Sequence, residues 1–236
     1  GQEMPLQLAG ESAARGQETV LAVTESEQVF TFEGLSEEPL PSLLRGFSAP
    51  VKLSYPYSRD DRVFLAKHDP DGFNRWEAAQ ALAVEVMQGL TEMARAGRPL
   101  MLDQRLIEVY RSVLNNPQLD PAMVAEIIRL PSEAYLVELA EQADIDAIHK
   151  VRETVRSDLA RALQEDMLAL WQRLAEHGPY SPDADAVARR SLKNTLLGYL
   201  MLTGSEEMLA ACVRQFIEAN NMTDRQAALV ALVNSS

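Results

Sequence analysis

Residues 73–99 read FNRWEAAQALAVEVMQGLTEMARAGRP, and their apolar side chains recur every three or four positions. This spacing places the apolar side chains on one face of a helix and the charged and amide side chains on the other, so it predicts one long amphipathic helix. Gly97 supplies a left-handed end for this helix, and Pro99 prevents its continuation. The apolar face consists of Trp76, Ala79, Ala83, Val86, Leu90 and Met93.

Helical periodicity extends over most of the chain after residue 57. A second long apolar stripe predicts a helix from Val151 to Leu174, ended by Gly178 and Pro179, with a preceding helix that begins at Asp144. Shorter helices begin at side-chain caps that are followed by proline or by acidic residues. Their predicted starts are Asp120–Pro121, Pro131–Ser132, Ser181–Pro182, Gly204–Ser205 and the capping-box pair Thr223 and Gln226. About nine helices with short connections and no fixed-period repeat favour an irregular array of antiparallel helical hairpins.

The chain before residue 57 has a different pattern. Four short runs rich in β-branched and aromatic residues, separated by Gly, Ser and Pro, predict strands. These runs are PLQLA at 5–9, TVLAV at 19–23, EQVFTFEG at 27–34 and APVKLSY at 49–55. We therefore predict a mainly α protein with two domains, a small β portion over residues 1–57 and a helical portion over residues 58–236. Trp76, just beyond this boundary, is the expected buried anchor between them.

The composition excludes several classes of protein. Of the 236 residues, 47% are apolar, which is enough for packed cores and excludes disorder as the main state. The formal net charge is −13 and cations are not clustered, so we expect no nucleic-acid partner. No apolar run approaches the roughly 20 residues that span a bilayer, so we expect no membrane partner. The first residues, GQEMPLQLAG, lack a secretory pattern and the single Cys212 allows no internal disulfide, which together predict a reducing cytoplasm.

The three histidines do not show metal-site spacing. His68, His149 and His177 have no second histidine or cysteine at the spacing that zinc requires, and H-E-x-x-H is absent. We interpret His149 and Glu153, four residues apart, as an ordinary pair on a helix surface. His177 is interpreted as a favourable charge at a helix C-terminus, and His68 as a neighbour of a turn rich in Asp and Pro.

The other candidate residues are interpreted as structural. Asp69, Asp71 and Asn74 fail the calcium-loop pattern and are predicted to form a tight turn that caps the following helix. Cys212 lies on an apolar helix stripe without an adjacent base, which predicts a buried structural thiol. The methionines interpreted as core or inter-helix contacts are Met87, Met93, Met167, Met201, Met208 and Met222. A Gly-rich phosphate loop and a Gly-x-Ser-x-Gly elbow are absent, so the residues alone predict no catalytic, cofactor-binding or metal-ligating residue.

Four stretches resemble one enzyme family, with their order preserved from Pro5 to the end of the chain. They are VTESEQVFTFEGL at 23–35, FSAPVKLSYPYSRDDRVFLAKHDPDGFNRWEAAQ at 47–80, EIIRLPSEAYLVE at 126–138 and EANNMTDRQAAL at 218–229. The most distinctive piece is FNRWEAAQ. Together they resemble bacterial alanyl aminopeptidases of the aminopeptidase N type, which are gluzincin zinc metallopeptidases.

This resemblance implies a parent protein of four parts. These are an N-terminal β saddle, a thermolysin-like catalytic domain, an immunoglobulin-like β domain and a large helical domain that closes over the active site. The chain resembles the later half of the third part and the first part of the fourth, so it implies a partial immunoglobulin-like segment before a partial α-superhelical domain. The family's Gly-x-Met-Glu-Asn segment, zinc motif and transition-state tyrosine match no position here, so no catalytic or zinc-ligating residue is carried over.

The resemblance leads to a functional expectation with two alternatives. We expect a non-catalytic fragment of a zinc aminopeptidase that supplies a wall of the substrate chamber, with zinc bound in the catalytic domain of the parent. Its expected partners are the remaining domains of the parent and, in the full-length protein, peptide substrates. An edge-strand dimer of the fragment is a further expectation, because half a sandwich leaves strand edges unpaired. The alternatives are an independent helical interaction module and a free-standing enzyme with an unrecognised site.

Overall fold

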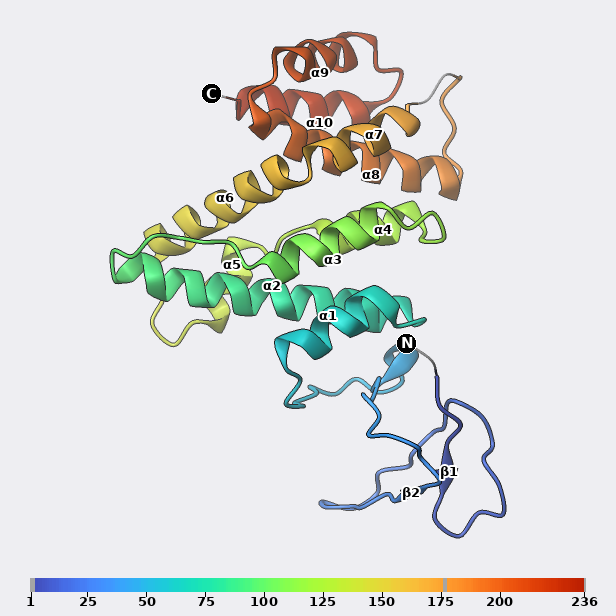
Figure 1. Ribbon diagram of the computed structural model, residues 1–236. Helices are drawn as coiled ribbons and strands as arrows, with labels where there is room; N and C mark the ends of the chain where they lie inside the picture. The colour runs from blue at the N-terminus through green and yellow to red at the C-terminus, as the bar shows by residue number, and fades with distance from the viewer. Residues whose placement is uncertain (1–2, 176–177, 236) are drawn as a thin grey trace. The chain divides into compact units, whose positions relative to one another are not determined.

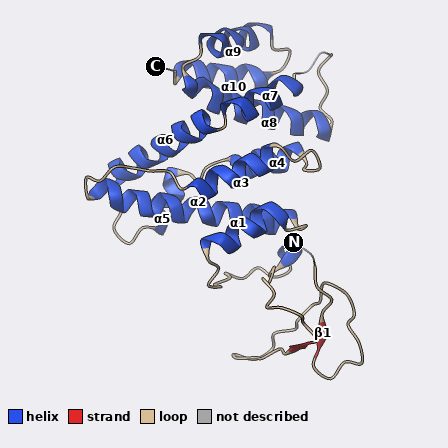
Figure 2. Cartoon of the chain, viewed as in Figure 1, coloured by secondary structure: helices blue, strands red, loops and turns tan. Residues whose placement is uncertain are grey.

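The computed structural model describes residues 3–175 and 178–235, and these residues are mainly helical (Figures 1 and 2). Their contacts divide them into two units, residues 3–43 and residues 44–235. Ten α-helices and one two-stranded sheet occur among the described residues. The predicted mainly α fold class is therefore confirmed, whereas the domain boundary predicted between residues 57 and 58 stays a prediction.

The helical unit combines packing between helices that follow one another in sequence with packing between helices that lie far apart in the chain. Helix α1 packs against α2 and α3, α4 against α8, and α10 against both α9 and α8. No helix in the described part of the chain has an apolar stretch long enough to cross a membrane. The elements are η1 (Arg45–Phe47), α1 (Arg59–His68), α2 (Gly72–Arg95), α3 (Gln104–Leu114), α4 (Pro121–Ile128), α5 (Glu133–Leu139), α6 (Ile145–Ala162), α7 (Gln164–Arg173), α8 (Ala184–Leu200), η2 (Met201–Thr203), α9 (Glu206–Glu218) and α10 (Met222–Val233).

Helix α2 confirms the long helix predicted from residues 73–99. Its N-cap is Asp71, whose carboxylate accepts a hydrogen bond from the backbone N–H of Asn74 at 2.8 Å. Gly97 follows the helix with a φ of 66°, the left-handed conformation that glycine adopts without strain. The helix packs against α1, α4 and α6. Its buried apolar residues are Ala78, Ala79, Leu82, Ala83, Val86, Met87 and Leu90.

Trp76 is only half-buried, which corrects the expectation of a fully buried anchor. Its ring lies 5.7 Å from the ring of Phe73 on the same helix, measured between ring centroids. Replacing Trp76 with alanine is expected to lower the free energy of unfolding by about 1 to 2 kcal/mol, below the roughly 3 to 5 kcal/mol of a fully buried tryptophan. Urea unfolding with an unchanged m-value measures this loss. A loss above about 3 kcal/mol would contradict the half-buried position.

The structure has two helices, α6 and α7, where one helix was predicted from Val151 to Leu174. The separate helix predicted to begin at Asp144 is instead the first part of α6. Helix α6 begins after its N-cap Asp144 and runs through Val151 to Ala162. The chain then bends at Leu163, which has a φ of −118° and is fully buried. After the bend α7 packs against α8 and α3, whereas α6 packs mainly against α2. The two halves of one apolar stripe therefore pack against different neighbouring helices.

The predicted helix starts are partly confirmed. Asp120, Ser132 and Ser205 are N-caps, and each accepts a backbone hydrogen bond from the first turn of its helix. The prediction at Ser181–Pro182 is wrong, because Asp183 caps α8 and the Ser181 hydroxyl bonds to its carboxylate. The capping box at Thr223 and Gln226 is also wrong. Asn221 caps α10 instead, accepting from the N–H of Asp224 at 2.9 Å.

The first unit contains little regular secondary structure. Strand β1 (Gln7–Leu8) pairs antiparallel with β2 (Phe32–Glu33), so that Leu8 lies opposite Phe32. These strands fall within two of the four predicted runs. The run at 19–23 forms no strand, and Val20 and Val23 are 91% and 70% exposed. The run at 49–55, which lies in the second unit, forms no strand in the described chain either. A high β propensity produces a strand only when another strand pairs with it, and these two runs have no such partner among the described residues.

Candidate functional site

The turn between α1 and α2 uses its acidic residues for its own hydrogen bonds. Buried Asp69 accepts from the N–H of Asp71 at 2.9 Å, and the guanidinium of Arg45 lies 3.5 Å from its carboxylate. The second carboxylate oxygen of Asp71 accepts from the N–H of Gly46 at 2.9 Å. Arg75 donates two hydrogen bonds to the carbonyl of Asp69, at 2.8 and 3.1 Å. The prediction of a helix-capping turn is therefore confirmed.

His149 pairs with a residue from another helix. Its Nδ1 lies 2.9 Å from the carboxylate of Glu133 on α5, and this hydrogen bond raises the pKa of His149 above its usual 6.5. Glu153, predicted to pair with His149, is not its hydrogen-bond partner, although the charge of Glu153 also contributes to raising the pKa of His149. Glu153 lies 3.4 Å from Arg152 and 3.5 Å from Arg156 instead. His149 is therefore an exposed surface residue, as predicted, but with a partner that lies 16 positions away.

The remaining candidate histidines are His68 and His177. His68 is exposed with its ring 5.0 Å from that of Phe64, and partial burial together with the nearby charges of Lys67 and Arg75 lowers its pKa. His177 lies outside the described residues. Within residues 3–175 and 178–235 no three histidine, cysteine, aspartate or glutamate side chains gather as a metal site would require.

Cys212 is the buried thiol that its place on an apolar stripe predicted. Its side chain is fully buried and donates to the carbonyl of Ala228 at 3.5 Å. Burial raises the pKa of this thiol, which keeps it protonated and unreactive at neutral pH.

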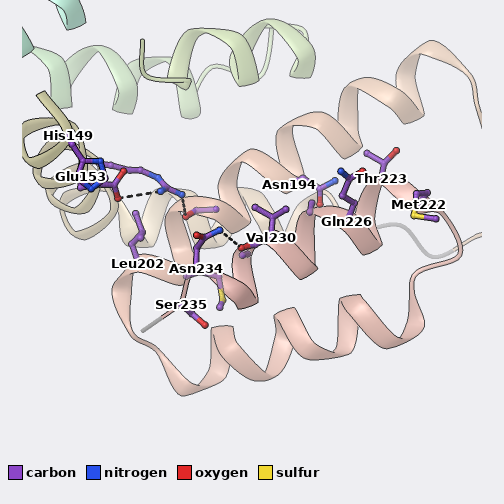
Figure 3. A pocket seen from close by; sticks show the side chains of 15 residues that line it. His149, Glu153, Asn194, Leu202, Met222, Thr223, Gln226, Val230, Asn234 and Ser235 are labelled. Atoms are coloured by element: carbon purple, nitrogen blue, oxygen red, sulfur yellow. Dashed lines mark hydrogen bonds and ion pairs between the residues drawn. The ribbon is translucent and has the colours of Figure 1, made fainter. Parts of the chain in front are cut away.

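A groove of about 770 Å³ lies between α6, α8, η2 and α10 (Figure 3). We call it the α6–α10 groove. Helix α10 forms one side with the stripe Thr223, Gln226 and Val230, which its C-cap residue Asn234 continues. The opposite end is formed by His149, Glu153 and Arg156 of α6. Pockets that hold small molecules have volumes of about 300 to 1,000 Å³, so the volume lies within that range.

The charged end of the groove is neutralised internally. Arg156 donates to the carbonyl of Gly198 on α8 at 3.2 Å, and its guanidinium lies 3.5 Å from the carboxylate of Glu153. Figure 3 shows this chain of contacts at one end, with Thr223 and Met222 at the other. One end of the groove therefore carries a fixed ion pair, and the rest is lined by uncharged side chains.

A buried ion pair supports the wall of the groove. Lys193 of α8 lies 2.7 Å from the carboxylate of Asp224 on α10, and both residues are buried. Asn194 lines the groove and donates to the same carboxylate at 2.8 Å. Gln215 of α9 donates to Asn194 at 2.9 Å. This network links α8, α9 and α10 through hydrogen bonds between their side chains.

The groove residues were not predicted as a site from the sequence. Met201 and Met222 were interpreted as core or inter-helix contacts, yet both line the groove and Met222 is 71% exposed. Met87, Met167 and Met208 are buried, as predicted. The only local signal was the recurrence of Thr223, Gln226 and Asn234 on one face of the last helix, which by itself indicates an ordinary solvated face.

Residues 59–236 match a family described as a domain of unknown function, DUF3458_C, with ARM repeats. The chain belongs to this family. Residues 2–56 match the companion family DUF3458, described as a domain of unknown function with an Ig-like fold. The helical hairpins seen here agree with the ARM description, and the resemblance to the aminopeptidase N type found in the sequence is confirmed by the relatives of the chain.

Three curated relatives are bacterial proteins named aminopeptidase N. The Escherichia coli protein is 37% identical over 233 residues, which cover 99% of this chain and 26% of the relative. The Haemophilus influenzae and Caulobacter vibrioides proteins are 33% and 34% identical and cover 89% and 91% of this chain. The crystal structure of Legionella pneumophila aminopeptidase A in complex with aspartic acid superposes with a TM-score of 0.79 at 30% identity, over 97% of this chain and 28% of that protein. The chain thus spans about a quarter of the length of its relatives.

Proposed function

We propose that this chain is a non-catalytic part of a zinc aminopeptidase that removes N-terminal residues from peptides. In this proposal its helices form part of the wall around the substrate chamber, and the remaining domains of the parent, in the cytoplasm, are its partners. The observation that carries the proposal is the alignment with aminopeptidase N, which covers 99% of this chain but only 26% of the relative. An alignment of this kind is expected of one part of a larger enzyme.

The residues of this chain do not fit a catalytic zinc site. Such a site needs three protein ligands, commonly histidine and glutamate, around one open position. The sequence lacks H-E-x-x-H, and the exposed side chains of His68 and His149 belong to different helices, α1 and α6. The proposal therefore assigns zinc, which activates water for hydrolysis when bound, to a part of the parent outside these residues.

An activity assay tests the proposal. The purified chain is incubated with alanyl p-nitroanilide, with and without added zinc, beside a full-length protein that contains these residues. We expect turnover from the full-length protein and none above the blank from the chain. Zinc-dependent turnover by the chain alone would overturn the proposal. A native gene that encodes only these residues would also overturn it and would favour an independent helical interaction module.

A further inference from the structure

The last two helices form a hairpin at one end of the helical unit (Figure 1). Helix α9 packs against α10, and the pair contacts the rest of the unit mainly through α8 and η2. Gly204 links η2 to Ser205, the N-cap of α9, and has a φ of 70°. Glycine adopts this left-handed conformation without strain, and the space beside it is open. The hairpin is therefore joined to the unit through one glycine link and one packed helix.

Little apolar surface holds this hairpin in place. Its buried residues are Met208, Ala211, Cys212, Asp224 and Ala228, of which only Met208 has a large apolar side chain. Cys212 contacts the carbonyl of Ala228, so part of this burial lies within the hairpin itself. Helix α8, by contrast, buries four leucines and a tyrosine. Because stabilisation grows with the apolar area removed from water, apolar packing holds the hairpin less firmly than it holds α8.

A polar network centred on Asp224 supplies the remaining attachment. Its carboxylate accepts from Lys193 and Asn194 of α8, at 2.7 and 2.8 Å. Gln215 of α9 donates to the side chain of Asn194 and to the backbone carbonyl of Asp224, at 2.9 and 3.0 Å. We call these four residues the Asp224 clasp. A buried carboxylate that loses its cation is costly, so a half-open clasp is less favourable than a closed or a fully solvated one.

A hairpin released from α8 does not keep its helices. Helices α9 and α10 have 13 and 12 residues, and isolated helices of this length are marginal in water. The buried contact between them joins two small residues, Cys212 and Ala228. Release therefore unfolds the hairpin, whereas α1 to α8 keep the packing contacts that they make with one another.

We propose that the α9–α10 hairpin opens as a separate unit, held closed by the Asp224 clasp, while α1 to α8 stay folded. Opening removes α10 from the α6–α10 groove, whose other sides belong to α6, α8 and η2. It also uncovers the part of α8 that carries Lys193 and Asn194. The hairpin is thus a strap over α8, and the groove exists only while this strap is closed.

Cys212, the single cysteine of the chain, reports the opening because its buried thiol reacts only when the hairpin is open. The chain is labelled with methyl methanethiosulfonate at a concentration low enough for closing to outpace labelling. The labelling rate of the native chain, divided by that of the unfolded chain, gives the open population. Urea unfolding followed by circular dichroism gives the globally unfolded population. In the wild type we expect the open population to exceed the unfolded population by at least about tenfold, with a weaker dependence on urea.

Two variants separate opening from global unfolding. Leu82→Ala removes a fully buried side chain of α2, which packs against α1, α3, α4 and α6. It is expected to raise the unfolded population by about thirtyfold or more and to leave the open population unchanged. Lys193→Met breaks the clasp and is expected to raise the open population by about a hundredfold or more. Lys150→Met, which removes an exposed cation of α6, is the matched control and is expected to leave the open population unchanged.

Three results would overturn this proposal. They are a wild-type labelling rate that global unfolding fully accounts for, a labelling rate that Leu82→Ala raises as much as it raises global unfolding, and a wild-type labelling rate in Lys193→Met. The first result needs no variant, so it decides the proposal even if Lys193→Met does not fold.

Discussion

Replacing Lys193 with methionine is expected to lower the free energy of unfolding by about 3 to 5 kcal/mol, because the change leaves a buried carboxylate without its cation. The Nζ of Lys193 lies 2.7 Å from Asp224, and the two side chains are only 10% and 7% exposed. Methionine keeps most of the apolar stem, so packing changes little. Urea unfolding followed by circular dichroism measures the loss. Lys150→Met, which removes an exposed cation of α6, is the matched control and is expected to cost less than about 0.5 kcal/mol.

A double-mutant cycle separates the ion pair from other effects at this position. Asp224→Asn removes the charge and keeps one acceptor oxygen, which replaces one of the two carboxylate oxygens that accept from Asn194 and Asn221. The double variant Lys193→Met with Asp224→Asn removes both charges, so no buried charge is left without its partner. Its loss in the free energy of unfolding is expected to be at least about 1 kcal/mol smaller than the sum of the losses in the two single variants. Additive losses would contradict a direct coupling between the two residues.

The pH dependence of stability gives a second check on the same pair. Burial raises the pKa of Asp224, but hydrogen bonds from Lys193, Asn221 and Asn194 outweigh it and hold the pKa below its usual 3.8. Because the folded-state pKa lies below the unfolded value, the contribution of this carboxylate is fully present above about pH 4 and is lost as the pH falls through the folded-state pKa. Wild type is therefore expected to lose stability below pH 4. A wild-type stability that rises as the pH falls through this window would contradict the assignment.

The parts of the fold that depend on local chemistry could be predicted from the sequence. Asp120 followed by Pro121 marks a helix start because the cap and the proline ring act within one turn, and the structure has α4 there. Gly97 ends α2 for a similarly local reason, since only its own φ is involved. The apolar residues of α2, spaced by three or four positions, predict most of its buried face, with Trp76 only half-buried. These elements needed no knowledge of distant segments.

The parts that failed depend on partners elsewhere in the chain. At Leu163 the apolar stripe continues without a break, yet the chain bends, because α6 and α7 pack against different helices. The valines of residues 19–23 have high β propensity but form no strand among the described residues. Asn221 takes the cap position predicted at Thr223, and its side chain also donates to the carboxylate of Asp224 at 3.1 Å within a buried network. The bend and the missing strand have no local signal, whereas the Asn221 cap acts within one helical turn and is a local feature that the choice of Thr223 overlooked.

The candidate site could not be predicted for the same reason. His149 and Glu133 meet across two helices, and the α6–α10 groove brings α6 beside α8, η2 and α10, which follow it much later in the chain. Its polar residues, Gln226 and Asn234, look in the sequence like an ordinary solvated face. Only the placement of α10 opposite α6 and η2 turns that face into one side of a groove.

Replacing Leu196 with alanine is expected to lower the free energy of unfolding by about 2 to 5 kcal/mol, because it removes a fully buried side chain and leaves a cavity. Leu196 lies on α8, which packs against α4, α6, α7 and α10, so no single neighbour can move to fill the space. Dense packing on several sides makes the cost of a cavity high. Urea unfolding at constant m-value measures it.

The control for this change is Leu209→Ala on α9, where the leucine is 44% exposed. The same atoms are removed, but water already covers much of the side chain, so the expected loss is below about 1 kcal/mol. The difference between the two losses in the free energy of unfolding therefore measures the effect of burial, because both variants remove the same atoms. Equal losses at Leu196 and Leu209 would mean that α8 is not packed as the structure describes, and the wall of the α6–α10 groove would lose its rigid support.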